Sequence, residues 1–326
     1  MKLPVVRVFA LGGTIATAAR AAKRRDAAGL VPSLSADALV DAVPSLSDVA
    51  RIEAVQFRQV PSPHLTTGDI VDLACAIAAN PAATVVTQGT DTIEETAFAL
   101  ECLLARDAPV VVTGAMRNPT LPGADGPANL LAAVQAAVDA GSAGSGVLVA
   151  FNDEIHAARF VVKGNTALPS AFASPQCGRL AQVVEGRICW FQRVDRLPAL
   201  DPAKLERSVR VPLWTVTLGD DGELLETLGE RIDGLVVATM GGGHVPPPMA
   251  CVLGKLAARI PVVLASRAGT GPLLRATYGY AGGEIDLASR GMTSAGWLAP
   301  NKARMLLQLA LMAGESDIPR LFEPFF

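Results

Sequence analysis

The sequence has few of the residues from which disulfide frameworks and metal sites are built. Its five cysteines are odd in number and widely spaced, without a Cys-x-x-Cys pair, and its three histidines include no i, i+4 pair. We therefore expect no disulfide, no metal site and no cofactor. Cys75 and Cys102 lie in alanine- and leucine-rich stretches, where a thiol packs as a small apolar side chain, so we expect both in the core.

Charge imbalance and long apolar runs are also missing. The 28 basic residues against 31 acidic ones leave a net charge of −3 and a pI near 5.7, which argues against a nucleic-acid partner. No apolar run reaches the roughly 18 to 20 residues that a membrane span requires. No charged region with a leader core precedes the strand-like sequence after Met1. We expect a cytoplasmic protein without a membrane partner.

Short apolar runs that end in Gly, Thr or Asn alternate with helical patterns along the chain. The runs are Val5 to Leu11, Thr84 to Thr87, Val110 to Thr113, Val147 to Phe151, Leu235 to Thr239 and Val262 to Ala265. One-sided helical spacing follows in the stretches 70–77, 93–104 and 303–310. This alternation predicts an α/β fold with a mainly parallel sheet covered by helices on both faces.

A change in composition divides the chain. Its 326 residues exceed the usual size of one core, so about two domains are expected. Between Asp195 and Pro212, three prolines and seven charged residues replace the apolar periodicity. We predict an N-terminal domain at 1–192, a linker at 193–212 and a C-terminal domain at 213–326.

Two turns place a threonine directly behind a predicted strand. They are Leu11-Gly12-Gly13-Thr14-Ile15-Ala16 and Gln88-Gly89-Thr90-Asp91-Thr92-Ile93-Glu94-Glu95-Thr96. In open α/β sheets, ligands bind at the carboxyl ends of the strands, so these hydroxyls are candidates for chemistry. A Gly-Gly-Thr turn alone is more typical of a tight strand-to-helix connection than of a catalytic site. Gly-x-Ser-x-Gly, Ser-x-x-Lys and nucleotide-binding glycine motifs are absent from the sequence.

The two turns resemble signatures of the bacterial-type L-asparaginase family, and the likeness extends over nearly the whole chain. Further matching segments, in order, are 114–117, 124–130, 152–153, 162–166 and 301–311. The resemblance implies a larger N-terminal catalytic domain and a smaller C-terminal domain with a flavodoxin-like parallel sheet. It also implies an amidohydrolase that converts L-asparagine to L-aspartate and ammonia through a threonine nucleophile and an acyl-enzyme.

The resemblance also assigns catalytic roles. Thr14 would be the nucleophile, and Thr90 the second essential hydroxyl. Lys163, with Asp91, would relay a proton to and from Thr90, as hydrolysis of a stable amide requires. Without the resemblance, a lone lysine such as Lys163 would be interpreted as a solvated strand residue.

Substrate-binding roles follow from the same resemblance. Asp91 would bind the ammonium group, Ser62 and backbone amides near Thr90 the carboxylate, and Ala115 would lie beside the scissile amide. Glu284 matches an acidic residue that a neighbouring subunit contributes, which implies a homodimer, commonly paired into a homotetramer. We assign Glu94 and Glu95 to capping of the following helix rather than to chemistry, because Asp91-x-x-Glu94 and Thr92-x-x-Glu95 both have capping-box spacing.

The sequence departs from the family at the predicted ammonium pocket and lid. The stretch Thr17 to Leu30 suggests a mobile lid or a solvated loop, and it lacks the family's tyrosine, since the only tyrosines are Tyr278 and Tyr280. Pro63 stands where relatives often have Gln. Gly241-Gly242-Gly243 replaces a region with an Asn, which leaves His244 nearby. A glutaminase, another small-amide hydrolase or a non-catalytic amino-acid-binding protein therefore remain alternatives.

Overall fold

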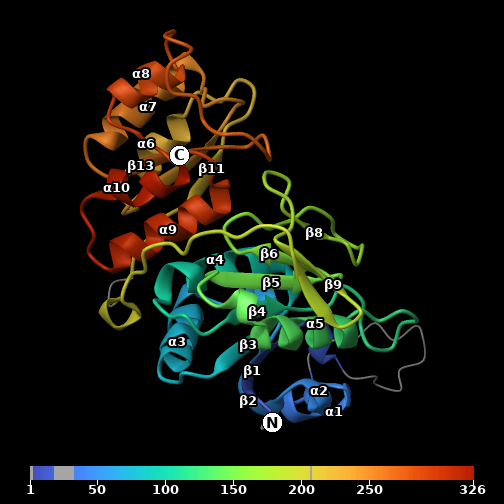
Figure 1. The fold of residues 1–326 in the computed structure, drawn as a ribbon. Helices are drawn as coiled ribbons and strands as arrows, with labels where there is room; N and C mark the ends of the chain where they lie inside the picture. The colour runs from blue at the N-terminus through green and yellow to red at the C-terminus, as the bar shows by residue number, and fades with distance from the viewer. Residues whose placement is uncertain (1–2, 18–32, 206–207) are drawn as a thin grey trace, which may run out of the picture. The chain divides into compact units, whose positions relative to one another are not determined.

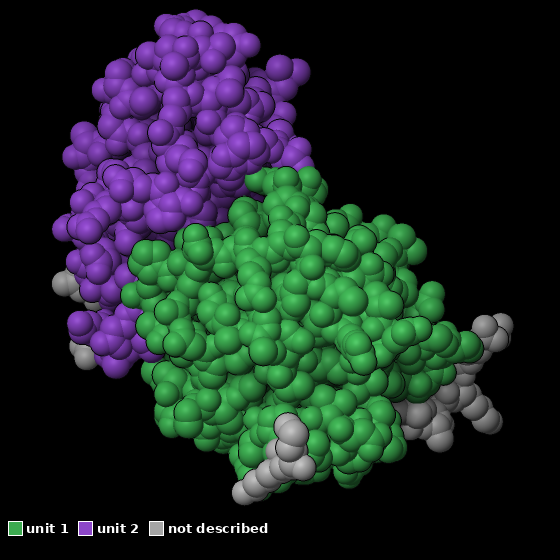
Figure 2. All heavy atoms as spheres, viewed as in Figure 1, with its two compact units in different colours: residues 1–199 green, residues 200–326 purple. Residues whose placement is uncertain are grey.

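The chain folds into two compact units, Met1–Ala199 and Leu200–Phe326 (Figure 2). The computed structural model describes residues 3–17, 33–205 and 208–326. Each unit has its own sheet, so the predicted α/β class with a larger first sheet and a smaller second one is confirmed (Figure 1). The boundary between the units falls inside the stretch 193–212, and the bounds of that linker stay a prediction.

The first unit is built on an eight-stranded sheet with the order β10-β9-β6-β5-β4-β3-β1-β2. Five of its strands are parallel to one another: β1 (Val5–Gly12), β2 (Arg51–Val60), β3 (Ala83–Thr87), β4 (Val110–Thr113) and β5 (Val147–Phe151). Three antiparallel strands extend one side: β6 (Glu154–Ala157), β9 (Ala181–Val184) and β10 (Arg187–Trp190). The parallel part was predicted; the antiparallel extension was not.

Helices cover both faces of this sheet (Figure 1). On one face, α1 (Ala36–Asp41), α2 (Leu46–Val49) and α5 (Gly126–Val138) share a core cluster with Val6, Val8, Val85, Val111 and Leu148. Helices α3 (Thr67–Ala78) and α4 (Ile93–Leu103) pack against each other on the opposite face. Strands buried on both faces explain the continuous valine-rich runs of the sequence.

The direction of chain progression reverses between β1 and β3. Strand β1 pairs in parallel with both β2 and β3, and the chain then continues on the β3 side through β4 and β5. Ligands bind at such a switch point because the connections after the two central strands diverge there and open a crevice. The two threonine-bearing turns follow these two strands.

The second unit contains a four-stranded parallel sheet. Its order is β11 (Leu213–Thr215), β12 (Leu235–Thr239), β13 (Val262–Ser266) and β14 (Thr293–Ser294). The helices of the unit are α6 (Glu223–Leu228), α7 (Pro247–Ala257), α8 (Glu284–Ser289), α9 (Pro300–Met312) and α10 (Ile318–Phe322). The predicted helical spacing at 303–310 is confirmed as part of α9.

The cysteine prediction was half right. Cys102 on α4 is buried, and burial raises the pKa of its thiol. Cys75 on α3 is exposed, because Ile70, Leu73, Ala74 and Ile77 occupy the inward face and position 75 points away from it. Among the described residues, no helix has the length and apolar character needed to span a membrane.

Candidate active site

A cavity of about 270 Å³ lies at the switch point of the first unit. Five of the predicted site residues line it, namely Thr14, Ser62, Thr90, Asp91 and Lys163. The wall is completed by residues to which no catalytic or binding role was assigned from the sequence: Gly13, Thr17, Pro61, Pro63, Gly89, Met116 and Thr166. The structure therefore brings both threonine hydroxyls and the lysine to one small polar hollow.

The two threonine turns touch through their glycines. Gly12 and Gly13 have φ values of 106° and 81°, a region that favours glycine. A Cβ on Gly13 would lie 2.1 Å from the backbone nitrogen of Gly89, and a Cβ on Gly89 would lie 2.7 Å from Oγ of Ser62. The missing side chains thus allow three separate segments of backbone to converge on the cavity.

Thr14 begins a 3-10 turn, Thr14–Ala16, directly after β1. Ile15 and Ala16 are buried in the core, which holds the turn against the sheet. The hydroxyl of Thr17 donates to the carbonyl oxygen of Thr14 at 2.8 Å. Thr17, the first residue of the predicted lid, is therefore a supporting residue of the cavity, and its hydroxyl three residues after Thr14 is the sequence signal for this bond.

A lysine connects Thr90 to Asp91. Nζ of Lys163 donates to Oγ1 of Thr90 at 2.9 Å and to Oδ1 of Asp91 at 2.5 Å. Thr90 is buried and the Lys163 side chain is 15% exposed, whereas the Asp91 side chain is 62% exposed. The predicted relay residues are therefore in hydrogen-bond contact, with the lysine between the hydroxyl and the carboxylate.

A short hairpin positions this lysine. Lys163 lies on β7 (Val162–Lys163), which pairs with β8 (Phe172–Ala173). The backbone N–H of Gly164 donates to the carbonyl of Ala171 at 2.7 Å, and the Phe172 ring packs on Phe151 at the end of β5, with centroids 4.6 Å apart. Phe172 is buried, so it anchors the hairpin to the main sheet.

The capping box predicted at Thr92-x-x-Glu95 does not form on the Thr92 side, and the capping role of Glu94 and Glu95 stays a prediction. Thr92, the N-cap of α4, makes no side-chain cap hydrogen bond. Its hydroxyl instead accepts a hydrogen bond from Nε2 of Gln88 at 3.1 Å. A 3-10 turn, Thr90–Thr92, leads into the helix and replaces the extended N-cap geometry that a capping box needs.

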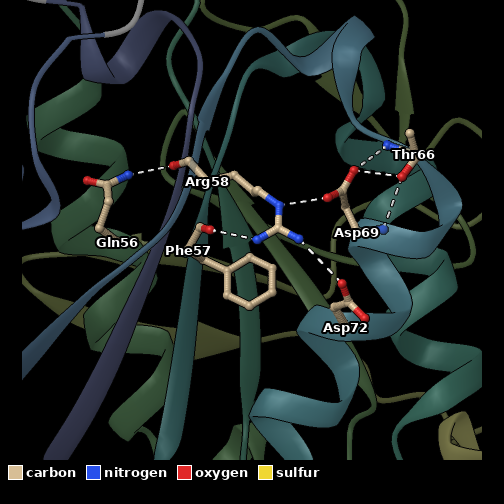
Figure 3. Close-up of polar contacts among 6 residues, drawn as sticks. All are labelled: Gln56, Phe57, Arg58, Thr66, Asp69 and Asp72. Carbon is tan, nitrogen blue, oxygen red and sulfur yellow. Dashed lines mark hydrogen bonds and ion pairs between the residues drawn. The ribbon is translucent and has the colours of Figure 1, made fainter.

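An ion-pair cluster braces the segment that carries Ser62 (Figure 3). Arg58 on β2 donates through Nε to Oδ1 of Asp69 at 2.7 Å and through a terminal nitrogen to Asp72 at 3.3 Å. Asp69 also forms the capping box of α3 with Thr66. Burial acts to raise the pKa of Asp69, but hydrogen bonds from Thr66 and Arg58 outweigh burial and lower it. The segment 61–65 is thus held at both ends.

The loop after β4 is fixed by a hydrogen-bond network that explains several matching segments. Asp125 accepts from the backbone N–H groups of Met116 and Arg117 at 2.9 and 2.8 Å. Asn129 donates to the carbonyl of Gly114 at 3.0 Å and accepts from the N–H of Asn152 at 2.9 Å. These side chains therefore position Met116 at the cavity rather than entering it themselves.

Ala115 stands differently from the other predicted binding residues. Its side chain is 1% exposed and belongs to the core cluster, and the neighbouring Met116 lines the cavity. The role of Ala115 beside the scissile amide stays a prediction.

Glu284 lies in the second unit, at the first position of α8. Its side chain is 5% exposed, and its Oε1 accepts from the backbone N–H groups of Thr277 and Tyr278 at 2.7 and 2.6 Å. Burial acts to raise the pKa of Glu284, but the N–H groups of Tyr278 and Thr277, with His244, outweigh burial and lower it. The contribution of Glu284 to a neighbouring site stays a prediction. The predicted lid falls mainly on residues 18–32, outside the described residues.

Comparisons with known proteins identify the family. The model of the N-terminal asparaginase domain matches residues 5–196, and that of the glutaminase/asparaginase C-terminal domain matches residues 210–322. A probable L-asparaginase of Deinococcus radiodurans is 39% identical, with 98% of this chain and 97% of the relative covered. L-asparaginase 2 of Escherichia coli is 34% identical, covering 95% of this chain and 90% of the relative.

A solved structure agrees with the sequence relatives. The crystal structure of a probable cytoplasmic L-asparaginase from Campylobacter jejuni matches with a TM-score of 0.86 and 32% identity, covering 98% of this chain and 99% of that one. Both family models, the full-length relatives and this structural match agree with the resemblance found in the sequence. The chain belongs to the bacterial-type L-asparaginase family, whose members are amidohydrolases.

Proposed function

We propose that this protein hydrolyses L-asparagine to L-aspartate and ammonia. One observation carries the proposal: Thr14 lines the same 270 Å³ cavity as Thr90, whose hydroxyl is hydrogen-bonded to Lys163. A nucleophile and a proton-relay group on one small cavity are what amide hydrolysis needs. The names of the L-asparaginase relatives support the choice of substrate.

The reaction would proceed in two displacements. In the first, Oγ1 of Thr14 attacks the side-chain carbonyl carbon, the C–N bond breaks, and the nitrogen takes up the proton lost by Thr14 and leaves as ammonia. In the second, water attacks the resulting ester, giving one proton back to Thr14 and its hydroxyl to aspartate. The Thr90–Lys163 hydrogen bond, 2.9 Å long, supplies the path by which protons move to and from the reacting groups.

Substrate binding would use the remaining polar groups of the cavity. Oδ1 of Asp91 is bonded to Lys163, which leaves Oδ2 for the ammonium group of the substrate. Ser62 and the backbone near Thr90 would receive the α-carboxylate, and the backbone of Ala115 would face the amide. A second hollow of about 520 Å³ shares Asp91, Lys163 and Thr166 with the cavity, so the Asp91 side of the site is open in a single chain.

This opening supports a site shared between subunits. We propose a homodimer, or a homotetramer built from two dimers, in which Glu284 of one chain completes the ammonium subsite of another. The cytoplasm is the proposed compartment, because the Campylobacter jejuni protein is named cytoplasmic, although a Haemophilus influenzae relative is named periplasmic. Glutamine is the alternative substrate, because an Acinetobacter glutaminasificans relative that is 33% identical is named glutaminase-asparaginase.

A panel of amides tests the proposed reaction. We expect the purified protein to release one ammonia and one aspartate per L-asparagine, measured with a coupled glutamate dehydrogenase assay and by amino-acid analysis. L-Glutamine tests the alternative substrate, since one methylene in a pocket changes kcat/KM by only about 10- to 200-fold. D-Asparagine tests the stereochemical preference. Binding of L-asparagine by calorimetry without ammonia release from any amide would refute the enzyme and favour a binding protein.

Subunit mixing tests the shared site. We expect Thr14→Ala to be inactive and Glu284→Ala to have a raised KM for L-asparagine. At an asparagine concentration well below that KM, unfolding and refolding the two variants together should restore about a quarter of wild-type activity, because half of random dimers are mixed and one of their two sites is intact. Intact dimers without any rescue would show that each chain holds a complete site.

A further inference from the structure

Glu284 is a nearly buried carboxylate without a lysine or arginine within ion-pair distance among the described residues. Its side chain is 5% exposed, and its one ion-pair contact in this part of the chain is Nε2 of His244, 3.3 Å from Oε2. Two backbone N–H groups hold Oε1, so the orientation of the carboxylate is fixed. A buried carboxylate of lowered pKa is ionised at neutral pH and attracts a cation.

The backbone around His244 is tightly constrained. Residues Met240 and His244 exchange two backbone hydrogen bonds of 2.9 Å across Gly241–Gly243, directly after β12. A Cβ on Gly243 would lie 3.5 Å from Cβ of Glu284, so the turn and the first residue of α8 are neighbours. The imidazole is thus brought to Glu284 by a closed turn rather than by a flexible loop.

Two tyrosines complete the surroundings of the imidazole. The Tyr278 ring meets the His244 ring edge-on at 5.0 Å between centroids, and the Tyr280 ring lies 5.5 Å away. Tyr278 and Tyr280 are 41% and 51% exposed. Exposed aromatic rings attract cations such as ammonium groups through their faces. The cluster of His244, Tyr278, Tyr280 and Glu284 therefore has the chemistry of an ammonium subsite.

We propose that His244 is a specificity-determining residue of this enzyme: through its bond to Oε2 of Glu284, it sets how strongly a neighbouring chain's substrate is held by its α-ammonium group. The proposal rests on the proposed function, in which Glu284 completes the neighbouring site. A hydrogen bond between the imidazole Nε2 and Oε2, 3.3 Å apart, orients the carboxylate. The ligand class that it selects is an α-amino acid amide over an amide without an amino group.

The test compares L-asparagine with succinamate, which is the same molecule without its amino group. We expect His244→Ala to lower kcat/KM for L-asparagine roughly ten- to a hundredfold, the worth of a hydrogen bond to a charged group, mainly through KM. The kcat/KM for succinamate should change less than about twofold, since succinamate has no ammonium group whose contact could be lost. His244→Gln keeps an N–H donor and should recover most of the loss.

The control variant is Lys255→Ala, which removes an exposed ion pair with Glu226 in the same unit. It should leave kcat/KM unchanged for both substrates. An equal loss of activity on both substrates, or no loss in a folded His244→Ala dimer, would overturn the proposal. Melting temperatures and dimer content distinguish loss of the His244 contact from misfolding. If His244→Ala does not fold, the comparison of the two substrates is made with His244→Gln. If Glu284→Ala leaves the selectivity for L-asparagine over succinamate unchanged, Glu284 does not complete the neighbouring site. If the wild type releases no ammonia, the proposed function is wrong. Either result would also overturn the proposed role of His244.

Discussion

Thr14→Ala is expected to lower kcat for L-asparagine by at least about a thousandfold, because a nucleophile that acts as one unit with its relay cannot be removed in part. The half-buried Thr14 side chain faces a cavity, so the protein should remain folded, with an unchanged circular dichroism spectrum and melting temperature. Ammonia release under saturating asparagine gives the kcat. Thr14→Ser keeps a hydroxyl and should retain far more activity than Thr14→Ala.

Thr120→Ala is the matched control, since Thr120 lies on an exposed loop and bonds only locally to Asn118. It should behave as the wild type. A Thr14→Ala enzyme with kcat within tenfold of the wild type would assign the nucleophile elsewhere. Acid-quenched wild type, digested and analysed by mass spectrometry, should carry an aspartyl ester on the peptide that contains Thr14.

Lys163→Met is expected to lower kcat by about a hundred- to ten-thousandfold, the usual worth of a positioned proton-transfer group. Methionine keeps a similar length of apolar chain but donates neither to Thr90 nor to Asp91, both of which Lys163 contacts. Initial rates over a range of asparagine concentrations separate kcat from KM. Asp91→Asn should instead act mainly on KM if Asp91 binds the ammonium group.

Lys163→Arg distinguishes a proton relay from a fixed positive charge. Arginine keeps the charge but does not deprotonate in proteins, so a relay should remain broken. Near-normal kcat in Lys163→Arg would mean that the lysine only stabilises charge. Near-normal kcat in Lys163→Met would remove Lys163 from the chemistry altogether.

Much of the first sheet could be predicted because each of its parallel strands is a short apolar run that ends at a turn. Val110–Thr113 and Val147–Phe151 are strands with the predicted bounds. The antiparallel strands β6, β9 and β10 were missed, because they are short and only partly apolar, as in the half-buried β9 and β10. Pairing between distant segments, not local composition, makes them strands.

Residues of the site could be predicted where a motif placed them at a strand end, but the contacts between them could not. The link from Thr90 to Lys163 spans 73 positions and depends on a hairpin of two-residue strands. Local patterns also misled: the spacing of Thr92 and Glu95 fits a capping box, yet the preceding 3-10 turn prevents it. Cys75 was assigned to the core because its helix is apolar overall, although only one face of α3 is buried.

The hydrogen bonds around Asp125 and Asn129 show why the resemblance extends beyond the cavity. Both side chains bond to backbone groups in other segments, at Met116 and Asn152 respectively. Such residues shape a loop without touching a ligand, so their position in the sequence alone suggests no chemistry. Pro63, one of the departures from the family, does line the cavity and has no side-chain donor to offer a substrate.

The contact of Gly13 with Gly89 holds the two threonine turns together independently of the residues that line the rest of the cavity. Since a Cβ on Gly13 would lie 2.1 Å from the backbone nitrogen of Gly89, the two threonine turns are in contact main chain against main chain. Wall positions such as Pro63, Met116 and Thr166 lie outside that contact. An evolving or engineered lineage can therefore exchange these wall residues to accept new amides while inheriting the reacting geometry unchanged.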